Sequence, residues 1–177
     1  MMQFYEALGL TPTLSLDLVD LQRRFYERSR EWHPDKFSRG TPAQRQRSLD
    51  MTALVNDAYR TLREPVLRAE YFLSQKGFEL SKNAPPELLE EVFELNMALE
   101  ELRGGDDSVR PQLQSADERF KQMRQEIDAD LSGLFASYDS APAPAVLEEI
   151  HGSLNRRRYI SNLVRDVEKE LNVHLSN

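Results

Sequence analysis

The sequence predicts an all-α protein made of two helical units. Apolar residues recur at steps of three and four, as on one face of a helix, through most of the 177 residues. No stretch alternates apolar and polar residues over the length of a strand between turn signals. The polar, proline-containing segment 81–86 divides the helical patterns into two groups.

Four helical patterns precede that segment. A short apolar pattern opens the chain and meets a glycine stop at Gly9. Thr41-Pro42 supplies a capping residue and a first-turn proline for a helix that runs to about Leu62, and a shorter helix follows from Val66 to a stop at Gly77. Between Gly9 and Thr41 we expect a basic helix, whose apolar residues at near-helical spacing are Leu14, Leu18, Leu21, Phe25 and Trp32.

The tripeptide His33-Pro34-Asp35 stands where this basic helix must end. Pro34 lacks a backbone N–H and disfavours helical geometry at His33. His33 and Asp35 are therefore expected on a short turn outside the core. Taken alone, the tripeptide reads as a helix terminator with a capping Asp.

The flanking patterns give the tripeptide a more specific meaning. Phe4-Tyr5-Glu6-Ala7-Leu8-Gly9-Leu10, the basic helix, His33-Pro34-Asp35 and the Asn-x-Ala-Tyr-x-x-Leu pattern of 56–62 follow one another in the order of a J domain. Residues 2–76 thus resemble that family. The resemblance implies a co-chaperone that docks on a DnaK-type ATPase chaperone and stimulates its ATP hydrolysis.

The resemblance also indicates which residues of this chain would contact the chaperone. The loop would be His33, Pro34 and Asp35, and we choose Arg24, Arg28 and Lys36 as the docking charges. Basic residues are frequent in the family around three positions that hold other residues here, namely Gln22, Tyr26 and Glu27.

Three helical patterns follow segment 81–86, at about 87–103, 111–137 and 144–173. They are separated by the short segments 104–107 and 138–142, and short loops between long helices favour antiparallel neighbours. We therefore expect a three-helix bundle. Its middle helix carries an almost unbroken apolar stripe, made of Val109, Leu113, Ala116, Phe120, Met123, Ile127, Leu131 and Leu134.

The first of these three helices has two apolar rows. The core row consists of Leu88, Val92, Leu95, Leu99 and Leu102. A second row is turned by about 100° around the axis and bordered by glutamates, which is typical of a protein-recognition surface with a polar rim. The alternative is a wide core face that packs on the first unit. The second row consists of Leu89, Phe93 and Met97, and its rim of Glu90, Glu94 and Glu101.

The whole chain resembles the HscB (Hsc20) family through its J-like start, the stretch 68–73 (Arg-Ala-Glu-Tyr-Phe-Leu), Gly77-Phe78 and the C-terminal bundle. The resemblance implies a J domain at 1–76, a connection at 77–86 and a scaffold-binding three-helix bundle at 87–177. It also implies delivery of an IscU-like iron–sulfur scaffold protein to an HscA-type chaperone. The carried scaffold-binding residues are Leu89, Phe93, Glu94, Met97, Glu101 and Tyr159. Met97 stands where acidic residues are usual in the family, and Glu90 where an apolar residue is frequent.

Charge and composition narrow the function classes. Residues 18–47 hold eight basic and four acidic residues, a net charge of +4, whereas 87–102 hold six glutamates and no Lys or Arg. A pI near 5.1 and the lack of an aromatic stacking platform or a second basic element argue against nucleic-acid binding.

The chain has no cysteine, so it forms no disulfide and no cysteine-ligated metal site of its own. No signal peptide or membrane span is readable, and we expect a cytoplasmic location.

We do not expect an enzyme. The histidines are His33, His151 and His174, and no phosphate loop, metal-spaced cluster or nucleophile motif accompanies them. We expect no cofactor and no metal, two protein partners and a monomer. The alternative is a J-domain adaptor that presents an unrelated client, or that dimerises through Leu89, Phe93 and Met97.

Overall fold

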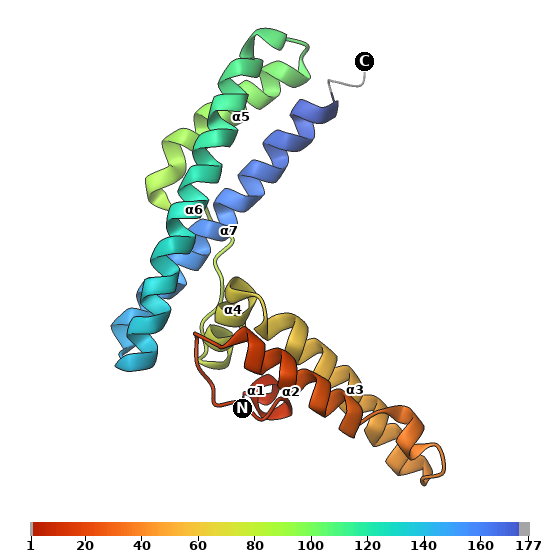
Figure 1. Cartoon of the computed structure of the whole chain (residues 1–177). Helices are drawn as coiled ribbons and strands as arrows, with labels where there is room; N and C mark the ends of the chain where they lie inside the picture. Colours follow the sequence, from red (N-terminus) through yellow and green to blue (C-terminus); the bar gives the residue numbers. More distant parts are fainter. Residues whose placement is uncertain (1, 174–177) are drawn as a thin grey trace. The chain divides into compact units, whose positions relative to one another are not determined.

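The structure is a computed structural model that describes residues 2–173. The all-α prediction is confirmed, since no strand occurs in that span, and none of its helices is long and apolar enough to cross a membrane. Short 3₁₀ turns lie at Pro34–Phe37, Pro86–Leu88 and Asp107–Val109. The α-helices are α1 (Gln3–Ala7), α2 (Leu18–Glu31), α3 (Pro42–Leu62), α4 (Pro65–Gln75), α5 (Leu89–Arg103), α6 (Arg110–Ser140) and α7 (Pro144–Val173) (Figure 1).

The chain divides into two compact units, and α6 contributes to both. The first unit contains Met1–Glu79 and Phe135–Pro142, and the second contains Leu80–Leu134 and Ala143–Asn177. The sequence predicted a loop from Tyr138 onward, which is wrong for three residues, because α6 continues to Ser140. The Ala141 N–H still donates to the Ser137 carbonyl at 3.0 Å, and Pro142 follows directly.

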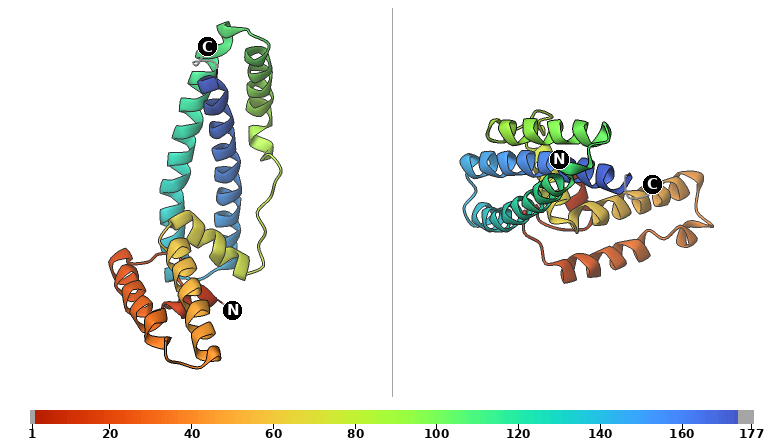
Figure 2. Two further views of the ribbon diagram at one scale, coloured as in Figure 1. Left: turned by 90° about the vertical axis from the view of Figure 1, so that its right-hand side faces the viewer. Right: turned by 90° about the horizontal axis from the view of Figure 1, so that it is seen from above.

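In the first unit, α2 and α3 lie side by side and are joined at one end by the loop that carries Pro34 (Figures 1 and 2). Asp17 begins α2 by accepting the backbone N–H groups of Val19 and Asp20 at 2.8 and 3.2 Å. Leu14 therefore lies before the helix, where it is buried, and Leu18 in the first turn is 52% exposed. The expectation that both belong to the core stripe of this helix was wrong. The core of the unit consists mainly of Tyr5, Leu8, Leu14, Leu21, Val55, Ala58, Leu62, Ala69, Phe72 and Leu73.

The second unit is the predicted three-helix bundle. Ion pairs join α6 to α5 through Arg119 and Glu91 and to α7 through Lys121 and Glu168, at 3.8 and 2.6 Å. α6 runs antiparallel to both neighbours, so α5 and α7 run parallel to each other (Figure 1). The predicted core row of α5 is buried, together with residues of α6 and α7 that include Leu113, Phe120, Ile127, Leu131, Ile150, Leu154, Ile160 and Val167.

Candidate functional site

The tripeptide His33-Pro34-Asp35 forms an exposed turn at the end of α2. Trp32 caps the helix, and His33 leaves helical geometry with a ψ of 128°. The Nδ1 atom of His33 accepts the Asp35 N–H at 3.3 Å and lies 3.6 Å from Asp35 Oδ2. The His33 and Asp35 side chains are 58% and 91% exposed, so both face solvent as the sequence analysis expected.

The base of this turn is anchored on α3. Ser48 Oγ and Thr52 Oγ1 donate hydrogen bonds to the Trp32 carbonyl at 2.7 and 3.1 Å. The ring of Phe37 stacks on that of Trp32 with a centroid distance of 6.0 Å, and the guanidinium of Arg47 lies 5.6 Å from the Trp32 ring centroid. These contacts fix the base of the turn, and the base presents His33 and Asp35 in a defined position.

The three cations chosen from the sequence fall in different places. Lys36 lies in the turn itself and is exposed. Arg24 donates to the Gly9 carbonyl and to Asp20, while Arg28 pairs with Glu31 at 2.6 Å. Arg24 and Arg28 therefore lie on the side of α2 that meets the α1–α2 loop.

A different face of α2 continues into the turn. Arg24 and Arg28 are each two residues from Tyr26, a rotation of about 200° around a helix, so Tyr26 points away from them. A shallow hollow of about 350 Å³ on this face is lined by Arg23, Tyr26, Ser29, Arg30 and His33. The spacing of three, four and three residues from Arg23 to His33 was the sequence signal for this shared face, and Tyr26 and Arg30 were not selected from it.

The second row of α5 is exposed within the bundle. Leu89, Phe93 and Met97 are 56%, 66% and 51% exposed, whereas the core row beside them is buried. The rim residues Glu90, Glu94 and Glu101 are exposed, and within the described part of the chain they form no ion pair. The arrangement is an apolar strip with uncompensated negative charge along one side.

Tyr159 lies on α7 beside the start of this strip. It precedes Glu170 by 11 residues, a rotation of only about 20°, and Glu170 pairs with Arg103 of α5 at 2.9 Å. Arg156, three residues before Tyr159, pairs with Glu87, two residues before Leu89, at 3.5 Å. Leu89 and Tyr159 thus stand at similar heights on the two parallel helices, and Tyr159 is half-buried.

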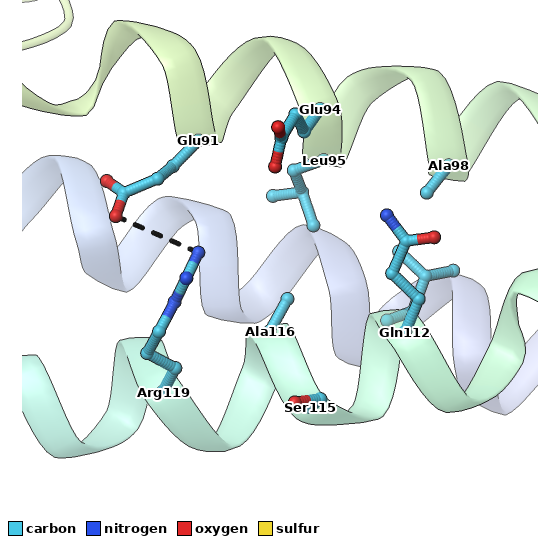
Figure 3. Close-up of a pocket in the computed structure, with 9 residues that line it drawn as sticks. Glu91, Glu94, Leu95, Ala98, Gln112, Ser115, Ala116 and Arg119 are labelled. Carbon is cyan, nitrogen blue, oxygen red and sulfur yellow. Dashed lines mark ion pairs between the residues drawn. The ribbon is translucent and has the colours of Figure 1, made fainter.

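On the other flank of α5, a groove of about 220 Å³ with a mixed polar and apolar lining lies between it and α6. Figure 3 shows Glu94 and Gln112 facing this groove and the ion pair between Glu91 and Arg119 at one end. Glu94 therefore belongs both to the rim of the apolar strip and to the wall of the groove.

Two histidines stand apart from these surfaces. His151 lies on α7, with its Nε2 atom 3.2 Å from Asn155 Nδ2, and His174 lies outside the described residues. Among residues 2–173, no three His, Asp or Glu side chains are grouped so that they could hold a metal ion.

Comparisons with known proteins assign both parts of the chain. Residues 3–71 match the DnaJ domain family, and residues 84–168 match the family described as the HSCB C-terminal oligomerisation domain.

Curated relatives match nearly the whole chain. A co-chaperone protein HscB homolog of Shewanella loihica is 30% identical over 172 residues, which cover 95% of this chain and 96% of the relative. A co-chaperone protein HscB homolog of Shewanella halifaxensis is 32% identical over 155 residues, which cover 84% and 87%.

Two solved HscB structures share the fold of this chain. Chaperone HscB from Vibrio cholerae is 28% identical with a TM-score of 0.66, and the match covers 94% of this chain and 95% of that one. The human co-chaperone protein HscB shares the fold with a TM-score of 0.69 at 24% identity, over 94% of this chain and 81% of the human one.

A J domain with an exposed His-Pro-Asp turn, followed by a helical bundle, defines a J-domain co-chaperone, a class that works with an Hsp70-type partner. The two curated relatives are co-chaperones. Within that class, the chain belongs to the HscB family.

Proposed function

We propose that this chain stimulates the ATPase of an HscA- or DnaK-type chaperone through His33, Pro34 and Asp35. The observation that carries the proposal is the exposed imidazole–carboxylate turn on a base held by α3. Lys36 and Arg30 add positive charge beside the turn, whereas Arg24 and Arg28 support the helix from its other side. The chaperone supplies the nucleotide chemistry, and the turn biases its conformation.

We further propose that the bundle carries an IscU-like iron–sulfur scaffold protein. Leu89, Phe93 and Met97 would form the apolar centre of the interface, and Glu94 and Glu101 its acidic rim, with Tyr159 at the edge. Such a surface fits a partner whose apolar patch is bordered by Lys or Arg. In this proposal residues 1–76 activate the chaperone, 77–86 connect, 87–177 hold the client, and the chain acts as a cytoplasmic monomer.

Two measurements on the full chain test these proposals. Addition of the chain to a purified HscA-type chaperone should accelerate steady-state ATP hydrolysis, and Asp35→Asn should remove the acceleration while the helical circular dichroism stays unchanged. Titration calorimetry should detect binding of an IscU-like scaffold. No acceleration with any HscA- or DnaK-type chaperone would overturn the first proposal, and no heat of binding the second.

The exposed row of α5 also fits a second function, in which two copies associate through Leu89, Phe93 and Met97. A dimer would double the mass measured by light scattering, and Phe93→Glu would return it to the monomer value. The scaffold proposal expects the monomer mass for the unaltered chain.

A further inference from the structure

The charges of α2 are largely cancelled along the helix. Its four arginines exceed its three acidic residues by one. Arg23 is bound by Asp20 and by Glu27, the latter at 2.7 Å, and Asp20 also accepts from Arg24 at 2.7 Å. Arg28 uses Glu31. In the described part of the chain, Arg30 alone among these arginines has no ion pair, and it lies one turn before His33.

Tyr26 lies between the cancelled charge of Arg23 and the free charge of Arg30. It is 54% exposed, a large apolar surface to leave in water. Its ring leans on Phe25 with a centroid distance of 5.5 Å, and Phe25 in turn stacks on Tyr59 of α3 at 4.2 Å. The phenol ring is therefore held against the half-buried stack of Phe25 and Tyr59, and it costs little ordering entropy when a partner covers it.

The hollow beside this ring is continuous with the candidate docking turn. His33 belongs to both, because its side chain lines the hollow that Tyr26 and Arg30 also line. A partner group that enters this hollow can therefore contact His33, Tyr26 and Arg30 together.

We propose that this hollow receives an apolar side chain of the Hsp70-type ATPase, with Tyr26 as its wall and Arg30 paired to a neighbouring carboxylate of the chaperone. Tyr26 then determines which chaperone docks. The preferred partner presents an apolar residue beside a single acidic one, rather than an extended run of carboxylates. This inference rests on the proposed function of the His33 turn, and it adds the chemistry of the surface that the turn meets.

The test is ATPase stimulation of purified HscA-type and DnaK-type chaperones by the full chain, measured against chain concentration. We expect Tyr26→Ala to raise the concentration for half-maximal stimulation by about tenfold, as for loss of an aromatic interface anchor, while the maximal stimulation stays unchanged. Tyr26→Phe should keep the half-maximal concentration, because the ring rather than the hydroxyl makes the contact. Val19→Ala, at an exposed position at the other end of α2, is the matched control and should have no effect.

Charge is tested separately. Tyr26→Lys should weaken stimulation of the preferred chaperone, and Arg30→Gln should reduce the salt dependence seen between about 50 and about 200 mM salt, leaving the part that Lys36 contributes. Unchanged stimulation by Tyr26→Ala, or tighter docking by Tyr26→Lys, would overturn the inference. Failure of His33→Gln to abolish stimulation would instead overturn the proposed function, so the two failures are distinct.

Discussion

The carboxylate of Asp139 accepts the backbone N–H of Leu14 at 2.9 Å, across 125 residues of sequence and within the first compact unit. Its second oxygen accepts the Ser15 N–H at 2.7 Å. On the other side, the buried guanidinium of Arg68 donates to the Leu14 carbonyl at 2.7 Å. Both polar groups of the Leu14 backbone are thus held by charged side chains from α4 and α6, which fixes the loop that leads into α2.

We expect Asp139→Ala to release this loop. Two backbone donors lose their acceptor, which should cost about 1–3 kcal/mol of unfolding free energy. Hydrogen exchange followed by NMR should show faster exchange of the Leu14 and Ser15 amides, with the amides of α5 unaffected. Asp130→Ala, at an exposed site on the same helix, is the control. Unaltered exchange at Leu14 and Ser15 would show that the carboxylate does not hold the loop.

Because Tyr5 is buried, we expect the free energy of unfolding to fall in alkali. Tyr5 is fully buried, and its hydroxyl donates to the Thr13 carbonyl at 2.6 Å. Burial raises the pKa of Tyr5 above its ordinary value of 10.0, so the native state holds the phenol proton more tightly than the unfolded chain does. The stability that this group contributes is therefore complete below that ordinary value and declines as the pH rises above it.

Tyr5→Phe separates the two effects of that side chain. The variant should lose about 1 kcal/mol of unfolding free energy at neutral pH because the hydrogen bond to Thr13 is gone. Between about pH 9 and about pH 11 its stability should fall less than that of the unaltered chain. Urea denaturation at a series of pH values measures both, and parallel declines in the two proteins would contradict the assignment to Tyr5.

We expect the hydrogen bond from Ser48 of α3 to stabilise the base of the His33 turn. The buried Ser48 hydroxyl provides one of the two hydrogen bonds to the Trp32 carbonyl, so Ser48→Ala should cost about 1 kcal/mol of unfolding free energy. Trp32 is the chain's single tryptophan, and its fluorescence should report a more solvated ring in the variant. Ser132→Ala, at an exposed site of α6, should leave the spectrum unchanged. An identical spectrum for Ser48→Ala would indicate that Thr52 alone anchors the turn.

We expect the exposed ring of Phe93 to contribute to the affinity for the client. Phe93→Ala should weaken binding of an IscU-like scaffold by about 1–3 kcal/mol if the ring anchors the interface. The free energy of unfolding should change by no more than about 0.5 kcal/mol, because the side chain is exposed. Leu67→Ala removes an exposed apolar side chain of α4 and serves as the control in the same calorimetric titration. Equal affinities for Phe93→Ala and the unaltered chain would exclude this face.

Local sequence signals were sufficient to predict the presence of the longer helices, the turn at Pro34 and the two rows of α5, but not the start of α2 or the end of α6. The predicted features depend on helical periodicity and on the missing N–H of proline, which act over a few residues. The direction of Arg24 could not be predicted, because Asp20 and the Gly9 carbonyl compete for it in the folded state. Asp139 looked like part of a loop, and its partner Leu14 is too distant in sequence for any pattern to indicate the contact.

The most direct test of the account is the ATP hydrolysis rate of an HscA-type chaperone with saturating amounts of the unaltered chain or of His33→Gln. The account predicts stimulation by the unaltered chain and none by the variant, with unfolding free energies that agree within about 0.5 kcal/mol because the histidine lies at the surface. Equal stimulation by a folded His33→Gln chain would contradict the central claim that this exposed turn activates the chaperone.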